Sequence, residues 1–421
     1  MKRIFYGWWM VAAGTGIQFL QSLFLVQSFG AYVAVLRDDR GWSKTALSGV
    51  AALQQVEAAL LGPIMGWFID RFGPRNVIRI GIVTMGIGFM LLGFTDSLLS
   101  FYCVFFIIAI GSSLSSYIPL NVAMMHWFQR RRARALSTMH LGLALGGTAV
   151  PLVAWSLVTW GWRATAFGSG VIIILAGWPL ASMIHNRPKD RGTTMDGLPE
   201  PPPQTGPSVA AAAAVVPGGD FTAREALRTS AFWLISLGHG FALFSVTAVN
   251  VHAVTHMKEA LGYSLEAAAL IITLMTLSQI GGVAIGWAVG DRWDKRLLAV
   301  ACMLMHMVAL LALTYAAETA LPVIAMLLVF AVLHGVAWGL RGPLMQAIRA
   351  DYFGTSAIGM ILGLSSMIVV VGQIGGPMIA GVMADATGNY RAGFTTIALL
   401  AGLGSVFFLA ARKPTRKPSA A

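Results

Sequence analysis

The sequence predicts an all-α membrane protein with twelve transmembrane helices in two six-helix pseudo-repeats. Of its 421 residues, 57% are hydrophobic and only 11% are charged, whereas a soluble domain carries about 25% charged residues. Apolar stretches of about 20 residues, enough to cross a bilayer, recur along the whole chain. Motifs of the first half also return in the second half at matched spacing.

The apolar segments divide the chain into two bundles and a linker. The N-terminal six-helix bundle is expected at 1–185, a cytoplasmic linker at 186–229 and the C-terminal six-helix bundle at 230–421. The linker centre, 199–208, is rich in proline and is expected to be disordered. Phe221–Arg228 alternates apolar and charged residues at helical spacing and predicts a short helix on the membrane surface. The predicted spans are 8–36, 45–69, 77–95, 99–127, 135–158, 164–185, 231–256, 264–290, 297–315, 321–347, 356–384 and 392–411.

The basic residues predict how the chain is oriented. Most of the 29 lysines and arginines fall at the termini and in loops on the same side of the membrane. The positive-inside rule therefore predicts a multi-pass protein of the cytoplasmic (inner) membrane with both termini in the cytoplasm. This one-sided distribution accounts for the net charge of +12, so nucleic-acid binding is not expected. The opposite side holds Arg37, Arg40, Lys44, Arg163, Lys258 and Arg391.

The two halves can be aligned by their own motifs. Trp42 and Asp70 are 28 residues apart, as are Tyr263 and Asp291. Such registrations indicate parallel repeats, an arrangement found in transporters whose halves move against each other. The other matched pairs are Trp9…Gly14 with Trp233…Gly238, Gly111…Pro119 with Gly335…Pro343, Gly146…Pro151 with Gly372…Pro377, and Trp162-Arg163 with Tyr390-Arg391.

A charged decamer, residues 66–75, separates the second and third predicted spans. It reads G-x-x-x-D-R-x-G-x-R, and it resembles the loop between the second and third helices of major facilitator superfamily transporters. The second half keeps an echo of it, with Trp287 where the first glycine would stand. We expect both copies to act in gating, the weaker copy contributing less. The gating residues are Gly66, Asp70, Arg71, Gly73 and Arg75, and in the second copy Asp291 and Arg292.

Shorter motifs resemble one branch of that superfamily, the monocarboxylate transporters and oxalate/formate antiporters. They are Tyr6-Gly7-Trp8, Trp127-Phe128 with Arg131-Arg132 and Ala135, and Gly375-Gly376-Pro377 followed by Asp385, Gly388 and Tyr390. The resemblance implies a monomeric secondary transporter without a cofactor. Its partners would be a small organic anion, first of all a monocarboxylate, together with protons and the lipid bilayer. A drug or metabolite exporter of the same fold is the alternative.

Ionisable residues within the spans are the first candidates for chemistry, because a charge in the bilayer is costly. Glu57 is the only acid deep in a span, either as a proton-coupling site or as an interhelical hydrogen-bond partner. Arg341 lies two residues before Pro343, as Tyr117 lies two before Pro119. In the resembling superfamily these spans line the cavity, so Arg341 and Tyr117 are expected to bind a carboxylate. The alternative places Arg341 at the cytoplasmic interface.

Polar residues at helical spacing on the first and seventh spans complete the candidate substrate site. Gln18 and Gln21 on the first span, and Ser245 and His252 on the seventh, fit the lining of a water-filled path. His252 is also a candidate proton carrier. Asn121 and His239 are further substrate-binding candidates, with interhelical hydrogen bonding as the alternative. His306 is left out because the ninth span is expected to face lipid or scaffold.

The resemblance is incomplete where carboxylate carriers of this branch place their cations. Many have an arginine in the eighth span, where this chain has Val283, and a lysine in the eleventh span, which is absent here. Either Arg341 supplies the positive charge, or the substrate is not a simple monocarboxylate. No catalytic constellation and no metal-ligand spacing is visible, so enzymatic activity is not expected. Cys103 and Cys302 are expected to be unpaired core residues.

Overall fold

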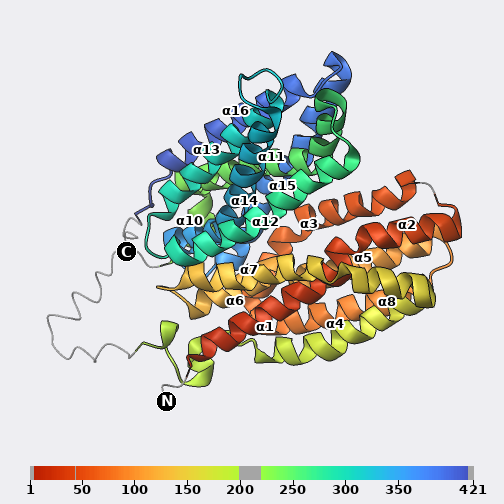
Figure 1. The fold of residues 1–421 in the computed structure, drawn as a ribbon. Coiled ribbons are helices and arrows are strands. Elements are labelled where there is room, and N and C mark those ends of the chain that lie inside the picture. Colours follow the sequence, from red (N-terminus) through yellow and green to blue (C-terminus); the bar gives the residue numbers. More distant parts are fainter. Residues whose placement is uncertain (1–3, 43, 199–219, 416–421) are drawn as a thin grey trace. The chain divides into compact units, whose positions relative to one another are not determined.

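The computed structural model describes residues 4–42, 44–198 and 220–415, and this part of the chain is helical without strands (Figure 1). It forms two compact units. The N-terminal unit is Met1–Val216 with Thr355–Leu364, and the C-terminal unit is Pro217–Gly354 with Ser365–Ala421. The proline-rich centre of the predicted linker lies outside the described residues.

In the N-terminal unit, α4 packs against α5 and α8, and α1 packs against α7. The helices follow the predicted spans in order, although several spans are made of two pieces. They are α1 (Tyr6–Gln21), the π-helix η1 (Ser22–Gln27), α2 (Phe29–Arg40), α3 (Lys44–Phe72), α4 (Pro74–Leu92), α5 (Leu98–Ser115), α6 (Tyr117–Trp127), α7 (Arg132–Thr148) and α8 (Val150–Met183).

Two of the breaks within spans follow from proline. Pro119 cannot donate to the carbonyl of residue 115, and its ring crowds that carbonyl, so α5 ends at Ser115 and α6 begins at Tyr117. Pro151 does the same at the boundary between α7 and α8, which falls inside the predicted fifth span. The expected loop between the fifth and sixth spans is instead a kink within α8 at Gly161, where φ is +77°.

The first span also departs from a single regular helix. After α1 the chain widens into η1, and the Ser28 hydroxyl bonds back to the carbonyl of Leu23 (2.6 Å) before α2 begins. A π-helix inserts an extra residue per turn and so rotates the face that follows. The helical face on which Gln18 and Gln21 were predicted to lie therefore does not continue in register beyond Gln21.

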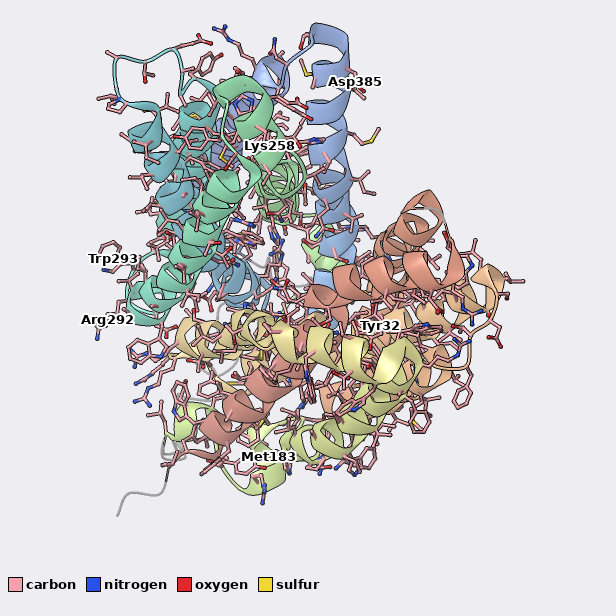
Figure 2. The ribbon with its side chains drawn as sticks, turned by 45° about the vertical axis from the view of Figure 1, so that its right-hand side comes forward. Tyr32, Met183, Lys258, Arg292, Trp293 and Asp385 are labelled. Carbon is pink, nitrogen blue, oxygen red and sulfur yellow. The ribbon has the colours of Figure 1, made fainter. Side chains whose placement is uncertain are left out.

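In the C-terminal unit, α14 packs against α12 and α13, and α16 packs against α11 and α13. Figure 2 shows Arg292 and Trp293 at one end of this unit and Lys258 and Asp385 at the other. Phe330, Phe394, Leu310 and Ile397 belong to its apolar core. The helices are α10 (Ala223–Leu227), α11 (Ser230–Leu261), α12 (Leu265–Val289), α13 (Lys295–Thr314), α14 (Val323–Phe353), α15 (Ile358–Thr387) and α16 (Arg391–Ala410). The first turns of α15, up to Leu364, belong to the N-terminal unit.

The helices agree with the predicted twelve-span architecture. Ten helices of the described part are long and apolar enough to cross a membrane. One of these, Arg132–Met183, contains both the fifth and the sixth predicted spans, and α3 corresponds to the second. The short α10 lies in the segment predicted as a surface helix. Both cysteines are free; Cys302 is buried, but Cys103 is exposed, so the prediction of a core position is wrong for Cys103.

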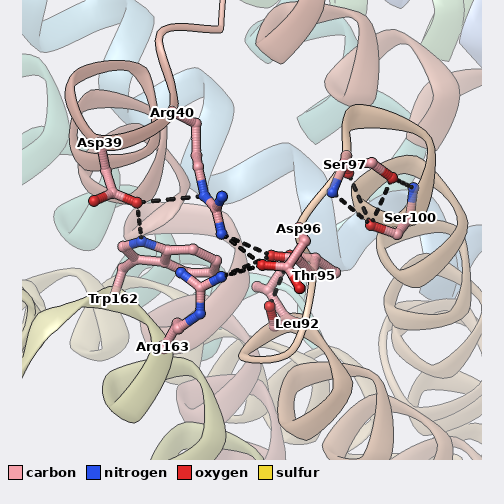
Figure 3. Close-up of polar contacts among 9 residues, drawn as sticks. All are labelled: Asp39, Arg40, Leu92, Thr95, Asp96, Ser97, Ser100, Trp162 and Arg163. Carbon is pink, nitrogen blue, oxygen red and sulfur yellow. Dashed lines mark hydrogen bonds and ion pairs between the residues drawn. The ribbon is translucent and has the colours of Figure 1, made fainter.

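In the N-terminal unit, a cluster of charged side chains joins three segments of the chain (Figure 3). The Asp96 carboxylate accepts from Arg40 (2.8 Å) and from Arg163 (2.5 Å). Asp39 accepts from the indole N–H of Trp162 (2.9 Å). The cluster thus links the end of α2, the α4–α5 connection and the kink of α8.

The C-terminal unit has a corresponding ion pair. Arg391 binds Glu318 (2.8 Å), and its guanidinium lies 4.9 Å from the ring centre of Tyr315. Arg163 and Arg391 are the matched residues of the sequence repeat. The repeat therefore preserves an ion pair between the start of the sixth span of each half and the connection before the fourth.

We expect the substitution Asp96→Asn to lower the melting temperature between pH 5 and pH 8. The hydrogen bond from Arg40 is the main cause that holds the pKa of Asp96 below its usual range. Because this pKa is lower in the folded state, the stabilisation is present above the ordinary aspartate pKa of about 3.9 and is lost as the pH falls through the folded-state pKa. The difference between wild type and variant should therefore shrink below about pH 4.

Thermal unfolding of the purified protein in detergent across this pH range measures the effect. Asp385→Asn, at an exposed aspartate near the end of α15, is the matched control. A melting-temperature difference that widens as the pH falls would contradict the role of Asp96.

Candidate functional site

Asp70 lies in the last turn of α3 and holds the first turn of α15. Its two carboxylate oxygens accept hydrogen bonds from the backbone N–H groups of Gly359 (2.9 Å) and Met360 (2.8 Å). A carboxylate at a helix N-terminus satisfies unpaired amides and interacts favourably with the helix dipole. This predicted gating residue therefore joins two segments of the N-terminal unit that are far apart in sequence.

Glycines let α3 and α15 approach closely at the same place. A Cβ added at Gly66 would lie 2.3 Å from the carbonyl oxygen of Gly359, and one at Gly363 would lie 2.2 Å from that of Gly62. These contacts are between backbones, so a side chain at either position would have to push the helices apart. The approach places the α15 amides within reach of Asp70.

The rest of the decamer forms a tight turn rather than an extended loop. Asp70 and Arg71 are still helical, and Gly73 (φ +77°) is the single residue between α3 and α4. The Arg75 amide donates to the side-chain oxygen of Asn186 (2.9 Å). The Arg71 guanidinium lies 5.4 Å from the ring centre of Trp67. Each polar residue of the decamer thus has a defined local contact.

The second copy of the decamer is built differently. Asp291 is half-buried and Arg292 is exposed at the end of the C-terminal unit (Figure 2). Asp294 caps α13 by accepting from the amide of Arg296 (2.8 Å), and Lys295 pairs with Asp351 (2.9 Å). The ion pair fastens the start of α13 to α14.

A polar cluster in the N-terminal unit contains two predicted substrate-binding residues. The Tyr117 ring stacks on the imidazole of His140 (5.2 Å between centres). His140 Nε2 lies 3.1 Å from the side-chain oxygen of Asn121 and, since that oxygen only accepts, donates to it. Asn121 is fully buried, and within the described part of the chain its Nδ2 has no hydrogen-bond partner.

The two glutamines of the first span have different surroundings. Gln21 donates to both the carbonyl (3.1 Å) and the hydroxyl of Ser112 on α5, so its amide links two helices. Gln18 is 1% exposed, and neither polar atom of its side chain has a partner among the described residues. Buried amides are ordinarily hydrogen-bonded, so Gln18 is the better placed of the two to take a ligand or water.

Glu57 is buried, as its candidate role requires. The Ser113 hydroxyl donates to Oε2 (3.0 Å), while Oε1 has no partner within the described residues. Ser113 and Ser112 are neighbours on α5, so Glu57 and Gln21 bind adjacent residues of the same helix. Sequence reasoning did not single out this serine pair.

In the C-terminal unit, Arg341 is 2% exposed and is among the largest fully buried side chains. It shares α14 with His334. His306 and His334 are themselves hydrogen-bonded through their Nδ1 atoms (3.2 Å). The sequence prediction omitted His306 because the ninth span was expected to face lipid or scaffold; the structure instead turns His306 toward α14.

A second buried arginine, Arg349, was predicted only as one of the basic residues of the cytoplasmic side. It lies eight residues after Arg341 on α14 and is 2% exposed. It donates to the hydroxyl of Ser365 (2.7 Å) and to Nδ1 of His239 (3.3 Å). Hydropathy alone could not find it, because its partners come from α11 and α15.

Two further candidates lie on α11. The Ser245 hydroxyl is fully buried without a partner in the described part of the chain. His252 Nε2 donates to the carbonyl of Pro377 (3.1 Å), and its ring lies 5.0 Å from that of Tyr390. Because the carbonyl only accepts, the neutral ring keeps its lone pair on Nδ1, where a proton can be added.

Two six-helix halves of apolar helices with buried charged and amide side chains are typical of secondary transporters of the membrane. A family model described as Major Facilitator Superfamily matches residues 14–319 and 235–421, and the chain belongs to this family.

Known proteins that are similar to the chain indicate its branch of the family. The chain is 26% identical over 428 residues to monocarboxylate transporter 13 of Bos taurus, covering 98% of this chain and 92% of that protein. It is 27% identical over 335 residues to the oxalate:formate antiporter of Oxalobacter formigenes, covering 78% and 73%. The proton:xylose symporter XylE has the same fold, with a TM-score of 0.70 at 17% identity, covering 98% and 97% of the two chains. The chain is thus a major facilitator transporter homologous to monocarboxylate transporters.

Proposed function

We propose that the chain is a secondary active transporter that moves a small organic anion, most simply a monocarboxylate, by proton-coupled symport or exchange. The observation that carries the proposal is the buried guanidinium of Arg341 in a membrane-spanning helix. A cation is costly there unless it serves a solute or a partner. A planar guanidinium can bind a carboxylate through two parallel hydrogen bonds.

Neutral polar residues are proposed to supply the remaining contacts to the anion. Gln18, Asn121 and Ser245 have buried polar atoms without partners among the described residues, which supports a role in holding solute or water. The other proposed substrate-binding residues are Tyr117, Gln21 and His239. All of these side chains are neutral donors or acceptors, so none of them brings an acid that would compete with the anion for Arg341.

Proton coupling is proposed for Glu57 and His252. Oε1 of Glu57 has no partner in the described part, and the lone pair of His252 is on Nδ1, so each can accept a proton. The positive charge added by protonating one of them would offset the negative charge of a bound monocarboxylate, which couples the two binding events.

Gating is proposed for the decamer 66–75 and its echo at Asp291 and Arg292. The hydrogen bonds of Asp70 to the start of α15 support a clasp that opens and closes during alternating access. In this proposal the bundles 1–185 and 230–421 are joined by the cytoplasmic linker 186–229. Both termini are cytoplasmic, the protein lies in the inner membrane, and it works as a monomer.

Ligand binding tests the substrate class. An anion that binds only the folded protein increases the free energy of unfolding, by about 2.7 kcal/mol at an anion concentration of 100 times Kd. The melting temperature rises as a consequence. We expect small carboxylates such as lactate, pyruvate, formate and oxalate to stabilise the detergent-purified protein, and neutral analogues such as lactamide not to. Stabilisation by bulky apolar compounds instead of organic acids would favour an exporter of the same fold and contradict the proposal.

A further inference from the structure

A hydrogen-bonded chain joins α11, α14 and α15 inside the C-terminal unit. Arg349 donates to the Ser365 hydroxyl through Nε (3.1 Å) and Nη2 (2.7 Å), and through Nη2 to Nδ1 of His239 (3.3 Å). Its Nη1 donates to the carbonyl of Met345 (2.7 Å). Ser365 in turn lies 2.8 Å from the hydroxyl of Ser236. Arg349 and both serines are buried, which holds the guanidinium in one orientation.

The chemistry of the donors fixes where the protons are. A guanidinium has only N–H donors, so Nδ1 of His239 must accept. In a neutral imidazole the proton is then on Nε2. The Ser365 oxygen accepts twice from Arg349, so its own proton is available for Ser236. No alternative arrangement satisfies all of these contacts at once.

We propose that Arg349 is a positioning residue that holds His239 as a neutral imidazole with its proton on Nε2. A proton added at Nδ1 would face an N–H of the guanidinium and place two positive groups in contact. His239 therefore presents a fixed N–H donor to an acceptor on the solute, and it does not carry the coupled proton. The part concerning the solute rests on the proposed transport of an organic anion; the proton position does not.

The surroundings of His239 are consistent with this assignment. The charged group in contact with its ring is Arg349 of α14, and Arg341 lies on the same helix. Both are cations, and like charges repel. The neighbouring positions of α11 and α15 supply Ser236 and Ser365, which do not titrate. The other histidines near α14, His306 and His334, are hydrogen-bonded to each other. His239 is only partly buried, and Nε2 is the ring nitrogen that does not face Arg349.

The tautomer can be measured without any transport assay. Two-bond ¹H–¹⁵N correlation spectra of ¹⁵N-histidine-labelled protein in nanodiscs distinguish the two neutral tautomers and the cation, and the spectrum of His239→Gln assigns the signal. We expect the wild-type signal to stay in the neutral Nε2–H form from pH 5.5 to pH 8. A proton on Nδ1, or a cationic ring at pH 6, would overturn the proposal even if no variant of Arg349 folded.

Transport kinetics test the consequence. Arg349→Met removes the hydrogen bond to Nδ1 of His239, so the imidazole can then take up a proton there. We therefore expect KM for the anion to become more dependent on pH between about 5.5 and 7.5, where a free imidazole gains its proton. Arg349→Lys, which retains a charged donor, should change the profile less. In a His239→Gln background, Arg349→Met should leave the pH profile of KM unchanged.

An equal change of the profile with and without His239 would overturn the positioning role, because Arg349 would then act through some other group. His239→Gln alone should raise KM by about fivefold, the value of one hydrogen bond. If no organic anion is transported at all, the proposed function fails, while the spectroscopic result still decides where the proton of His239 lies.

Discussion

Replacing Arg341 by glutamine is expected to lower kcat/KM for the transported anion by at least about 100-fold. Each hydrogen bond between a charged pair contributes about 1.5–3 kcal/mol, and a guanidinium can form two to one carboxylate. Their loss corresponds to a factor of about 10²–10⁴ in affinity. Glutamine retains one neutral donor and much of the side-chain volume, so the helix packing around α14 is disturbed as little as the change allows.

Initial rates of labelled carboxylate uptake into proteoliposomes measure the effect, with the amount of reconstituted protein held equal. Arg341→Lys should be intermediate, because lysine keeps the charge but not the paired donors. Arg412→Gln makes the same chemical change at an exposed position after α16 and should transport as wild type does. Wild-type uptake by both Arg341→Ala and Glu57→Gln would refute the site assignment.

Gly66→Ala is expected to reduce the maximal transport rate by at least about tenfold, with a smaller change in KM. The added Cβ would lie 2.3 Å from the carbonyl oxygen and 2.6 Å from the carbonyl carbon of Gly359. Both are backbone atoms, so the conflict is relieved only by separating α3 from α15. That separation would lengthen the bonds from Gly359 and Met360 to Asp70, and overpacking of this kind typically costs about 1–3 kcal/mol.

Gly168→Ala is the matched control, since a Cβ at that position of α8 meets nothing within 4 Å. Alanine in a helix interior is favoured over glycine by up to about 1 kcal/mol, so this variant should be neutral or slightly stabilised. Rates measured at saturating substrate compare the two variants. Normal turnover in Gly66→Ala would show that the close crossing is not needed for the transport cycle.

The architecture could be predicted from the sequence because hydropathy and repeat spacing are local properties. The spans follow from apolar runs, and the duplication follows from pairs such as Trp42–Asp70 and Tyr263–Asp291. The breaks at Ser116 and Ala149 were not predicted, although Pro119 and Pro151 supply their physical cause. No comparable residue in the sequence marks the π-helix of the first span.

The polar partners of the candidate site were harder to foresee. The burial of Arg341 and Glu57 follows from their places in apolar spans. Arg349 was grouped with the basic residues of the cytoplasmic side, and His306 was set aside with its span. Their roles depend on contacts to other helices, which a single sequence does not specify.

The central claim is that the chain carries a small organic anion across the membrane through a site that contains Arg341. Counterflow tests it most directly: proteoliposomes preloaded with an unlabelled monocarboxylate are diluted into a trace of the labelled compound. We predict rapid, saturable accumulation of label with the wild-type protein, dependent on the imposed pH gradient or on the internal anion, and almost none with Arg341→Gln. Uptake of every carboxylate at the rate of protein-free liposomes, by wild-type protein shown to be folded, would contradict the account.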